Sequence, residues 1–181
     1  DGTTTQANSI GVEIRTNSNN IGGTTTSARN VIAGNASYNI TVTTGINSTI
    51  NGNYIGVDAT GTTRKGFADD IYLFGSTNHN TIGGSTANDR NIISGGGTGV
   101  LFNSSTSYNV VSGNFIGTNA SGTATVSNGS GSGIYLTGSN QQIGGTTSGQ
   151  RNIISGKNSG IYIPGGSANS LSPMTVAARA V

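Results

Sequence analysis

A tandem repeat of 61 residues constrains this chain more than any other feature of its sequence. Two motifs recur at this interval, Ile-Gly-Gly and Arg-Asn. They begin at Ile21, Ile82 and Ile143, and at Arg29, Arg90 and Arg151, respectively. A constant interval is typical of a supersecondary unit stacked on copies of itself, because such units bury their apolar faces only against their neighbours. The sequence therefore predicts a solenoid.

The composition excludes several classes of protein. Only 31% of the 181 residues are apolar, so a round core is not expected, although Ile at repeated registers argues against disorder. The net charge is +2 without a run of Lys or Arg, so nucleic acid is not expected as a partner. The chain has no cysteine and a single histidine, His79, which excludes thiolate and His-based metal sites. No apolar run approaches the ~20 residues of a membrane span.

Apolar residues recur within each unit in short alternating bursts, bounded by Gly, Asn and Ser, which predicts β-strands rather than helices. Each unit holds two coils of three strands. The first strands are predicted at 12–14, 40–42, 71–73, 100–102, 134–136 and 161–163. The second strands centre on Ile21, Ile50, Ile82, Val111, Ile143 and Leu171. The third strands carry an inward column of Ile32, Ile55, Ile93, Ile116 and Ile154.

These columns predict an all-β parallel solenoid of about six three-stranded coils, stacked ~4.8 Å apart. Residues 1–176 are expected to form one domain, and residues 177–181 a C-terminal tail. The repeat units within that domain are about 1–57, 58–118 and 119–176.

Polar residues form two columns at the corners of the coils. One opens the third strands and consists of Asn30, Asn53, Asn91, Asn114 and Asn152. The other stands two residues before the second-strand centres and consists of Asn19, Ser48, Asn80, Asn109, Gln141 and Asn169. Asn suits a corner because it tolerates left-handed backbone and its amide can bond the Asn above and below. Both columns are therefore predicted to be structural ladders.

Loops alternate between odd and even coils. Odd coils carry an insert between the second and third strands, at 22–29, 83–90 and 144–151, and even coils carry a long loop after the third strand, at 57–70 and 118–133. Each insert ends in an arginine, which gives the column Arg29, Arg90 and Arg151. We expect each guanidinium to bond carbonyl groups of its own Gly-Gly loop. The alternative is a binding stripe for an anionic polymer.

The repeat resembles that of a known family. Segments such as NTIGG at 80–84 and RNIISG at 90–95 are similar to the repeat NxIGG…RNxISGN…GIxI of right-handed parallel β-helix proteins. These belong to the pectin-lyase-like superfold, in its surface-protein branch. The resemblance covers residues 1–172 and implies a right-handed β-helix that is secreted or at the cell surface. It implies no catalytic residues, and the superfold hosts lyases, hydrolases, adhesins and structural parts.

The densest group of charges joins Arg64-Lys65 to Asp69-Asp70. Paired carboxylates serve polysaccharide hydrolases as acid and base, but the equivalent loop at 118–133 has no carboxylate. Calcium-dependent lyases need more clustered acidic ligands than this chain offers. We therefore expect a solvated loop, and no catalytic, cofactor-binding or metal-binding residues.

The middle residues of the first strands point outward by the two-residue alternation. They are Glu13, Thr41, Tyr72, Leu101, Tyr135 and Tyr162. From Tyr72 onward the column is unusually apolar for an exposed face, which makes its last four members a candidate interface for sugar rings or for another protein. The alternative is a ladder that only stabilises its neighbours.

Together these features favour a non-enzymatic extracellular or cell-surface solenoid with a structural or adhesive role. The alternative is a polysaccharide-binding or polysaccharide-degrading β-helix, so carbohydrate is a second candidate partner. Residues 1–4 align with 60–63, and 171–176 align with 111–116, so the two ends are in register and carry no obvious cap. Head-to-tail stacking into a filament is therefore expected, and a fragment of a longer solenoid is the alternative.

Overall fold

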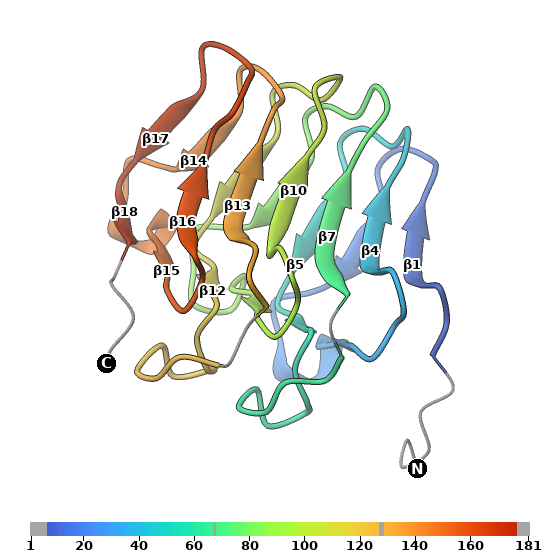
Figure 1. The fold of residues 1–181 in the computed structure, drawn as a ribbon, viewed down its shortest axis with the longest axis vertical. Helices are drawn as coiled ribbons and strands as arrows, with labels where there is room; N and C mark the ends of the chain where they lie inside the picture. Colours follow the sequence, from blue (N-terminus) through green and yellow to red (C-terminus); the bar gives the residue numbers. More distant parts are fainter. Residues whose placement is uncertain (1–6, 67, 127–128, 177–181) are drawn as a thin grey trace.

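The computed structural model describes residues 7–66, 68–126 and 129–176. The predicted tail at 177–181 and the loop around Asp1 lie outside the described residues. Within the described part, three sheets of six parallel strands surround one apolar core (Figure 1).

Each sheet takes one strand from every coil. Sheet A contains β1 (Ile10–Ile14), β4 (Tyr38–Val42), β7 (Asp69–Leu73), β10 (Val100–Phe102), β13 (Ser132–Leu136) and β16 (Ser159–Tyr162). Sheet B contains β2 (Asn20–Gly22), β5 (Thr49–Asn51), β8 (Thr81–Gly83), β11 (Val110–Ser112), β14 (Gln142–Gly144) and β17 (Ser170–Ser172). Sheet C contains β3 (Val31–Ile32), β6 (Tyr54–Ile55), β9 (Ile92–Ile93), β12 (Phe115–Ile116), β15 (Asn152–Ile154) and β18 (Met174–Val176). Two 3₁₀ helices, η1 (Thr26–Ala28) and η2 (Ser148–Gln150), lie in the inserts of coils 1 and 5.

The register of the strands matches the predicted columns. Val12 pairs with Ile40 in sheet A, Ile21 with Ile50 in sheet B, and Ile32 with Ile55 in sheet C, and each column continues through all six coils. The prediction of an all-β parallel solenoid with six three-stranded coils is confirmed.

The interior is a stack of aliphatic side chains. Ile55, Ile93 and Ile116 are fully buried, as are their neighbours in the other two sheets. Burial of each such side chain contributes about 1.5–3 kcal/mol. In the sixth coil, Ile161 and Leu171 are only partly buried, because no further coil of the described residues covers them. The core is therefore a continuous column that is most complete in the central coils.

The Ile-Gly-Gly motif is explained by the turn at the end of the sheet B strands in odd coils. Its first glycine, which is Gly22, Gly83 or Gly144, has a φ of 98°, 91° or 95°, respectively. A Cβ atom on Gly83 would lie 1.9 Å from the carbonyl oxygen of Ser112 in the next coil. Only glycine combines the left-handed backbone with this close approach.

Left-handed residues other than glycine mark the corner between sheets A and B. They are Ser18, Asn47, His79, Tyr108, Asn140 and Ala168. Each immediately precedes a member of the second polar column. The left-handed backbone that we expected at the ladder residues therefore falls one residue earlier. The left-handed residue turns the chain just before each ladder residue, so that ladder side chains such as Asn80 and Asn109 point into the corner, where they are buried.

Both polar columns form hydrogen-bonded ladders. In the first, Asn53 Nδ2 donates to Asn91 Oδ1 (3.1 Å), and Asn91 Nδ2 donates to Asn114 Oδ1 (2.9 Å). The ends of this ladder are Asn30, which donates to Asn53, and Asn152, which accepts from Asn114. In the second column, the equivalent bonds join Asn80 to Asn109 and Asn109 to Gln141. In both ladders each amide donates toward the C-terminal end, so the ladders share one polarity.

Arg29 and Arg90 reach the next coil rather than their own loop. Arg29 contacts Gly52 and Tyr54, and Arg90 contacts Gly113 and Phe115. Arg90 Nε donates to the carbonyl oxygen of Gly113 (3.1 Å), and its guanidinium carbon lies 4.0 Å from the centroid of the Phe115 ring. For Arg29 and Arg90, the expected bond to the Gly-Gly loop of the same coil is therefore wrong. The aromatic ring of the following coil attracts the guanidinium across the gap.

The long loops of the even coils fold back as hairpins over the outer side of sheet C. Antiparallel bridges close them between Val57 and Arg64 and between Thr118 and Thr125. A second apolar cluster lies beneath them, consisting of Val57, Ile92, Phe115 and Val126 with Tyr54, Ala120 and Ile153. In the third unit Arg151 is exposed, and Thr175 occupies the register position of Tyr54 and Phe115. The long loops of the even coils therefore cover a small additional core.

Candidate functional site

The outer side of sheet A carries a continuous apolar column. Sheet A faces the viewer in Figure 1, and Tyr72, Leu101, Tyr135 and Tyr162 are paired side by side on β7, β10, β13 and β16. Tyr162 is 49% exposed at the end of the column. Since parallel strands lie ~4.8 Å apart, the three intervals of this column span about 14 Å.

Two further aromatic residues, Tyr38 and Phe74, extend this surface. The Tyr72 ring lies 5.1 Å from that of Tyr38 and 4.8 Å from that of Phe74, between centroids. Tyr135 meets Tyr162 edge to face at 5.4 Å. We call the complete set the aromatic face: Tyr38, Tyr72, Phe74, Leu101, Tyr135 and Tyr162.

Sequence reasoning missed Tyr38 and Phe74. Phe74 stands two residues after Tyr72, so the alternation that placed Tyr72 outward extends to it. Tyr38 pairs with Ile10 and Asp69, in a column that precedes the predicted strands and has no shared residue type. Only the register of the folded sheet places its ring beside that of Tyr72.

Thr41 departs from the predicted outward column. It lies between Glu13 and Tyr72 in register, yet only 1% of it is exposed. A short side chain beside the large Tyr72 ring is easily covered, so the exposed apolar stripe begins at Tyr72. Glu13 stands apart on the edge strand, in an ion pair with Arg15 (2.9 Å).

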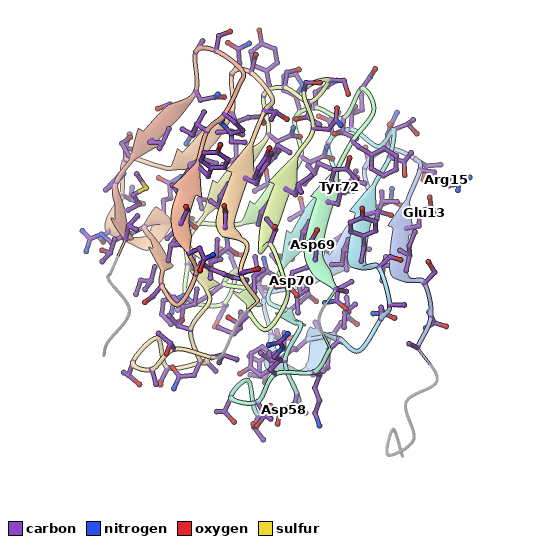
Figure 2. All side chains as sticks on the ribbon, in the orientation of Figure 1. Glu13, Arg15, Asp58, Asp69, Asp70 and Tyr72 are labelled. Atoms are coloured by element: carbon purple, nitrogen blue, oxygen red, sulfur yellow. The ribbon has the colours of Figure 1, made fainter. Side chains whose placement is uncertain are left out.

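Polar groups border the aromatic face. Asn103 Nδ2 donates to the Tyr72 hydroxyl (3.4 Å). Asp69 begins β7, the strand that also carries Tyr72, as Figure 2 shows. Burial, with smaller effects of Tyr72 and Asp69, raises the pKa of Tyr38. Tyr38 is therefore a neutral phenol near neutral pH, and the face combines apolar rings with hydroxyl groups and one neighbouring carboxylate.

Asp70 is fully buried at the corner where the chain enters β7, so the expectation of a solvated loop is wrong for this residue. Asn39 Nδ2 donates to Asp70 Oδ1 (2.9 Å), and Asn35 Nδ2 in turn donates to Asn39 Oδ1 (2.9 Å). Two glycines leave the space that the Asp70 carboxyl group occupies. A Cβ atom on Gly56 would lie 2.2 Å from Asp70 Oδ1, and one on Gly96 would lie 2.7 Å from Asp70 Cγ.

Lys157 reaches the same corner from the turn between β15 of the fifth coil and β16 of the sixth. Its Nζ donates to the carbonyl oxygens of Gly96 (2.7 Å) and Gly97 (3.0 Å). Burial raises the pKa of Asp70 to about 7, although Lys157 and hydrogen bonds from Asn39 and Gly96 oppose this shift. Burial likewise lowers the pKa of Lys157 to about 8, against the attraction of Asp70. The buried Asp70 and the half-buried Lys157 thus influence each other's pKa, and both contact Gly96.

Asp69 and Asp70 do not face a common solvent-accessible position. Asp69 Oδ1 accepts a hydrogen bond from the Thr98 N–H (2.5 Å), whereas Asp70 is turned into the corner. Glycoside hydrolysis requires two carboxyl groups that flank a substrate bond, about 5–9.5 Å apart. Within residues 7–66, 68–126 and 129–176, no three His, Cys, Asp or Glu side chains gather as a metal site. The corner therefore offers a buried electrostatic network rather than an acid pair.

Asp70→Asn is expected to flatten the pH dependence of stability between about pH 4 and 7. The folded pKa of Asp70 lies near 7, above its ordinary value of 3.8. Folding therefore takes up a proton in this window, and the stability that Asp70 contributes at low pH is lost as the pH rises through the folded pKa. Urea unfolding at a series of pH values measures the slope.

Asp58→Asn is the matched control for this measurement. Burial alone would raise the pKa of Asp58, but hydrogen bonds from Thr60, Thr63 and Thr62 outweigh it and lower the pKa to about 2. Its contribution is therefore lost only as the pH falls below about 4, and the slope above pH 4 stays as in the wild type. An Asp70→Asn slope equal to that of the control would show that Asp70 does not titrate in this range.

Comparison of the chain with models of protein families, with curated proteins and with solved structures gives no match. The resemblance to surface proteins of the pectin-lyase-like superfold therefore remains a prediction from the repeat. Among the described residues, no helix has the length and apolar character needed to span a membrane.

Proposed function

We propose that this protein is a non-enzymatic extracellular solenoid with a structural or adhesive role, and that it adheres through the aromatic face. The observation that carries the proposal is the contrast between three outer columns. That of sheet B is polar at every position except Val110, with Asn20, Thr49, Thr81, Gln142 and Ser170 as its other members. That of sheet C packs beneath hairpins, whereas the apolar column of sheet A ends in an exposed Tyr162.

The scaffold behind this face supports a mechanical role. Every coil is hydrogen-bonded to its neighbours in three sheets, and the two corner ladders add side-chain hydrogen bonds between the central coils. Such a body is stiff along its axis, because lengthening it would break several bonds at once. The extracellular setting rests on the resemblance of the repeat, and the absence of an exposed acid pair at Asp69 and Asp70 supports a role without catalysis.

Polysaccharide binding is the second candidate function, and the linear arrangement of rings favours it. Tyr72, Tyr135 and Tyr162 present aromatic rings at intervals of whole coils along one line. Aromatic rings of this kind provide large apolar contacts together with a hydroxyl group for hydrogen bonding. A polysaccharide could lie along the stripe and contact several rings.

A bead-adhesion assay tests the proposal. Beads coated with the protein are applied to surfaces coated with a neutral polysaccharide, an acidic polysaccharide or serum albumin. Tyr72→Ala/Tyr135→Ala is expected to lower bead retention several-fold, because it removes two rings of the aromatic face. Thr49→Ala/Thr81→Ala alters the polar column of sheet B and should leave retention unchanged. Equal retention of both double variants would exclude the aromatic face as the adhesive surface.

The same polysaccharides also test for catalysis. Prolonged incubation with the protein, with and without calcium, is expected to release neither reducing ends nor unsaturated products. Turnover that disappears in Asp69→Ala or Asp70→Ala would instead establish a polysaccharide-degrading enzyme. Retention only on polysaccharide surfaces, without turnover, would favour the second candidate function.

A further inference from the structure

Two tyrosines of neighbouring coils are in ring contact on sheet A. Tyr38 belongs to β4 of coil 2 and Tyr72 to β7 of coil 3, and their ring planes lie at 30° to each other with the centroids 5.1 Å apart. Phe74 stacks on Tyr72 as well, with 4.8 Å between centroids. The neighbouring rings therefore hold the Tyr72 ring in place. Both tyrosines are only half-buried, so a small reagent in the solvent can reach them.

Two phenol rings in such contact can be joined by oxidation. Each phenol loses one electron and one proton, and the two radicals form a carbon–carbon bond between the ring carbons next to the oxygens. Each of these carbons then gives up its hydrogen as a proton, and each oxygen takes one up again. The product, dityrosine, keeps both hydroxyl groups and has lost two hydrogens in all. Its ring centres are separated by one bond length and two ring radii, so the observed 5.1 Å requires little movement.

The polar groups around the pair suit this reaction. Asp69 is the register partner of Tyr38, so a carboxylate that can take up a phenol proton stands on the adjacent strand. Figure 2 shows that Asp69 and Tyr72 come from the same strand, β7. Asn103 Nδ2 donates to the Tyr72 hydroxyl oxygen (3.4 Å). This bond uses a lone pair of the oxygen and not its hydrogen, which is the atom that oxidation removes.

The chain has no cysteine, so disulfides cannot join its coils. We propose that Tyr38 and Tyr72 form a dityrosine cross-link between coils 2 and 3 when a one-electron oxidant, such as a peroxidase with hydrogen peroxide, acts on the protein. The peroxide takes up the two electrons and two protons and becomes water. The link closes a loop between residues 38 and 72 in the unfolded chain, so it stabilises the fold as a disulfide does. It requires only the ring contact, and not that the aromatic face adheres to anything.

Photo-oxidation with a ruthenium complex tests the proposal, with persulfate as the electron acceptor that becomes sulfate. The protein is kept dilute, so that coupling between molecules is slow. We expect dityrosine fluorescence and an intact monomer whose mass is lower by two hydrogens. After digestion with trypsin, the link should join the peptides 30–64 and 66–90. The second peptide contains Tyr72 as its only tyrosine, so this link is distinct from any that forms between Tyr135 and Tyr162.

Single substitutions identify the two rings. Tyr38→Phe and Tyr72→Phe keep the ring but remove one phenol, so each should lower the yield of this link at least tenfold. Tyr108→Phe is the matched control, because Tyr108 is 53% exposed and its ring stacks on His79, and it should leave the yield unchanged. Wild-type protein oxidised in denaturing urea should also lose the link at least tenfold, because the ring contact belongs to the folded chain. Circular dichroism establishes that each variant is folded.

Three outcomes would overturn the proposal. One is wild-type protein in which Tyr108 is oxidised but the link is absent, because the oxidant would then have reached the chain without joining the pair. The second is a fractional yield that rises with protein concentration, since the coupling would then occur between molecules. The third is an equal yield in folded and unfolded protein. The adhesion assay measures bead retention on untreated protein, so failure of adhesion and failure of cross-linking are distinguishable.

Discussion

Gly83→Ala is expected to lower the free energy of unfolding by about 4 kcal/mol or more, the range reached only when packing is severely disrupted. Gly83 has a φ of 91°, which already disfavours a Cβ atom. That atom would also lie 1.9 Å from the carbonyl oxygen of Ser112, which belongs to the backbone of the next coil. The oxygen can move only if sheet B opens between coils 3 and 4. Urea unfolding followed by circular dichroism measures the loss.

Gly34→Ala separates the two causes of this loss. Gly34 has a φ of 77°, but a Cβ atom there would meet nothing within 4 Å. Its substitution should therefore cost only the backbone strain, about 1–2 kcal/mol. If the two alanine variants were equally stable, close stacking at the Ile-Gly-Gly turn would not be the reason for its glycine.

Asn91→Ala is expected to cost about 3 kcal/mol. Asn91 Oδ1 accepts from both the N–H and the Nδ2 of Asn53, and its own Nδ2 donates to the carbonyl of Ile50 (2.8 Å). Alanine leaves these groups buried without that partner, at about 1–3 kcal/mol for each group left unsatisfied. A loss of this size shifts the thermal midpoint by roughly 6–12 °C in a chain of this length.

Asn30→Ala is the control at the exposed end of the same ladder. Asn30 Nδ2 donates to Asn53 Oδ1 (3.0 Å), but Asn30 is exposed, and the Asn30 N–H still donates to that oxygen after substitution. The expected cost is below about 1 kcal/mol, because water replaces the lost bond. Equal costs at the two positions would refute the idea that burial gives the ladder its strength.

The columns of the core could be predicted from the sequence because their cause is local. Alternation within a burst fixes which side chain points inward, and the constant interval fixes which burst lies above which. Ile55 and Ile93 therefore had to meet, and they do. The same logic placed the Asn ladders, since Asn53 and Asn91 hold the same position within their coils.

The remaining features depend on contacts between coils that have no common residue pattern. The burial of Asp70 depends on the absence of side chains at Gly56 and Gly96, and on Lys157 from the turn between the fifth and sixth coils. To predict the stacking of Arg90 on Phe115, one would have to know that an aromatic residue of the next coil lies within reach of the insert. These are properties of the stacked neighbours rather than of any single segment.

The alternation of two kinds of coil determines how a molecule of this design can change its length. Arg90 of an odd coil uses the carbonyl of Gly113 in the even coil that follows, and the Gly52 N–H of an even coil donates to Asp89 in the insert that follows. Deleting a single coil would bring two coils of one kind together and remove one of these contacts. Deleting a pair would restore both. Insertions and deletions therefore keep both kinds of contact between coils only when they span a whole 61-residue unit, which is one odd and one even coil.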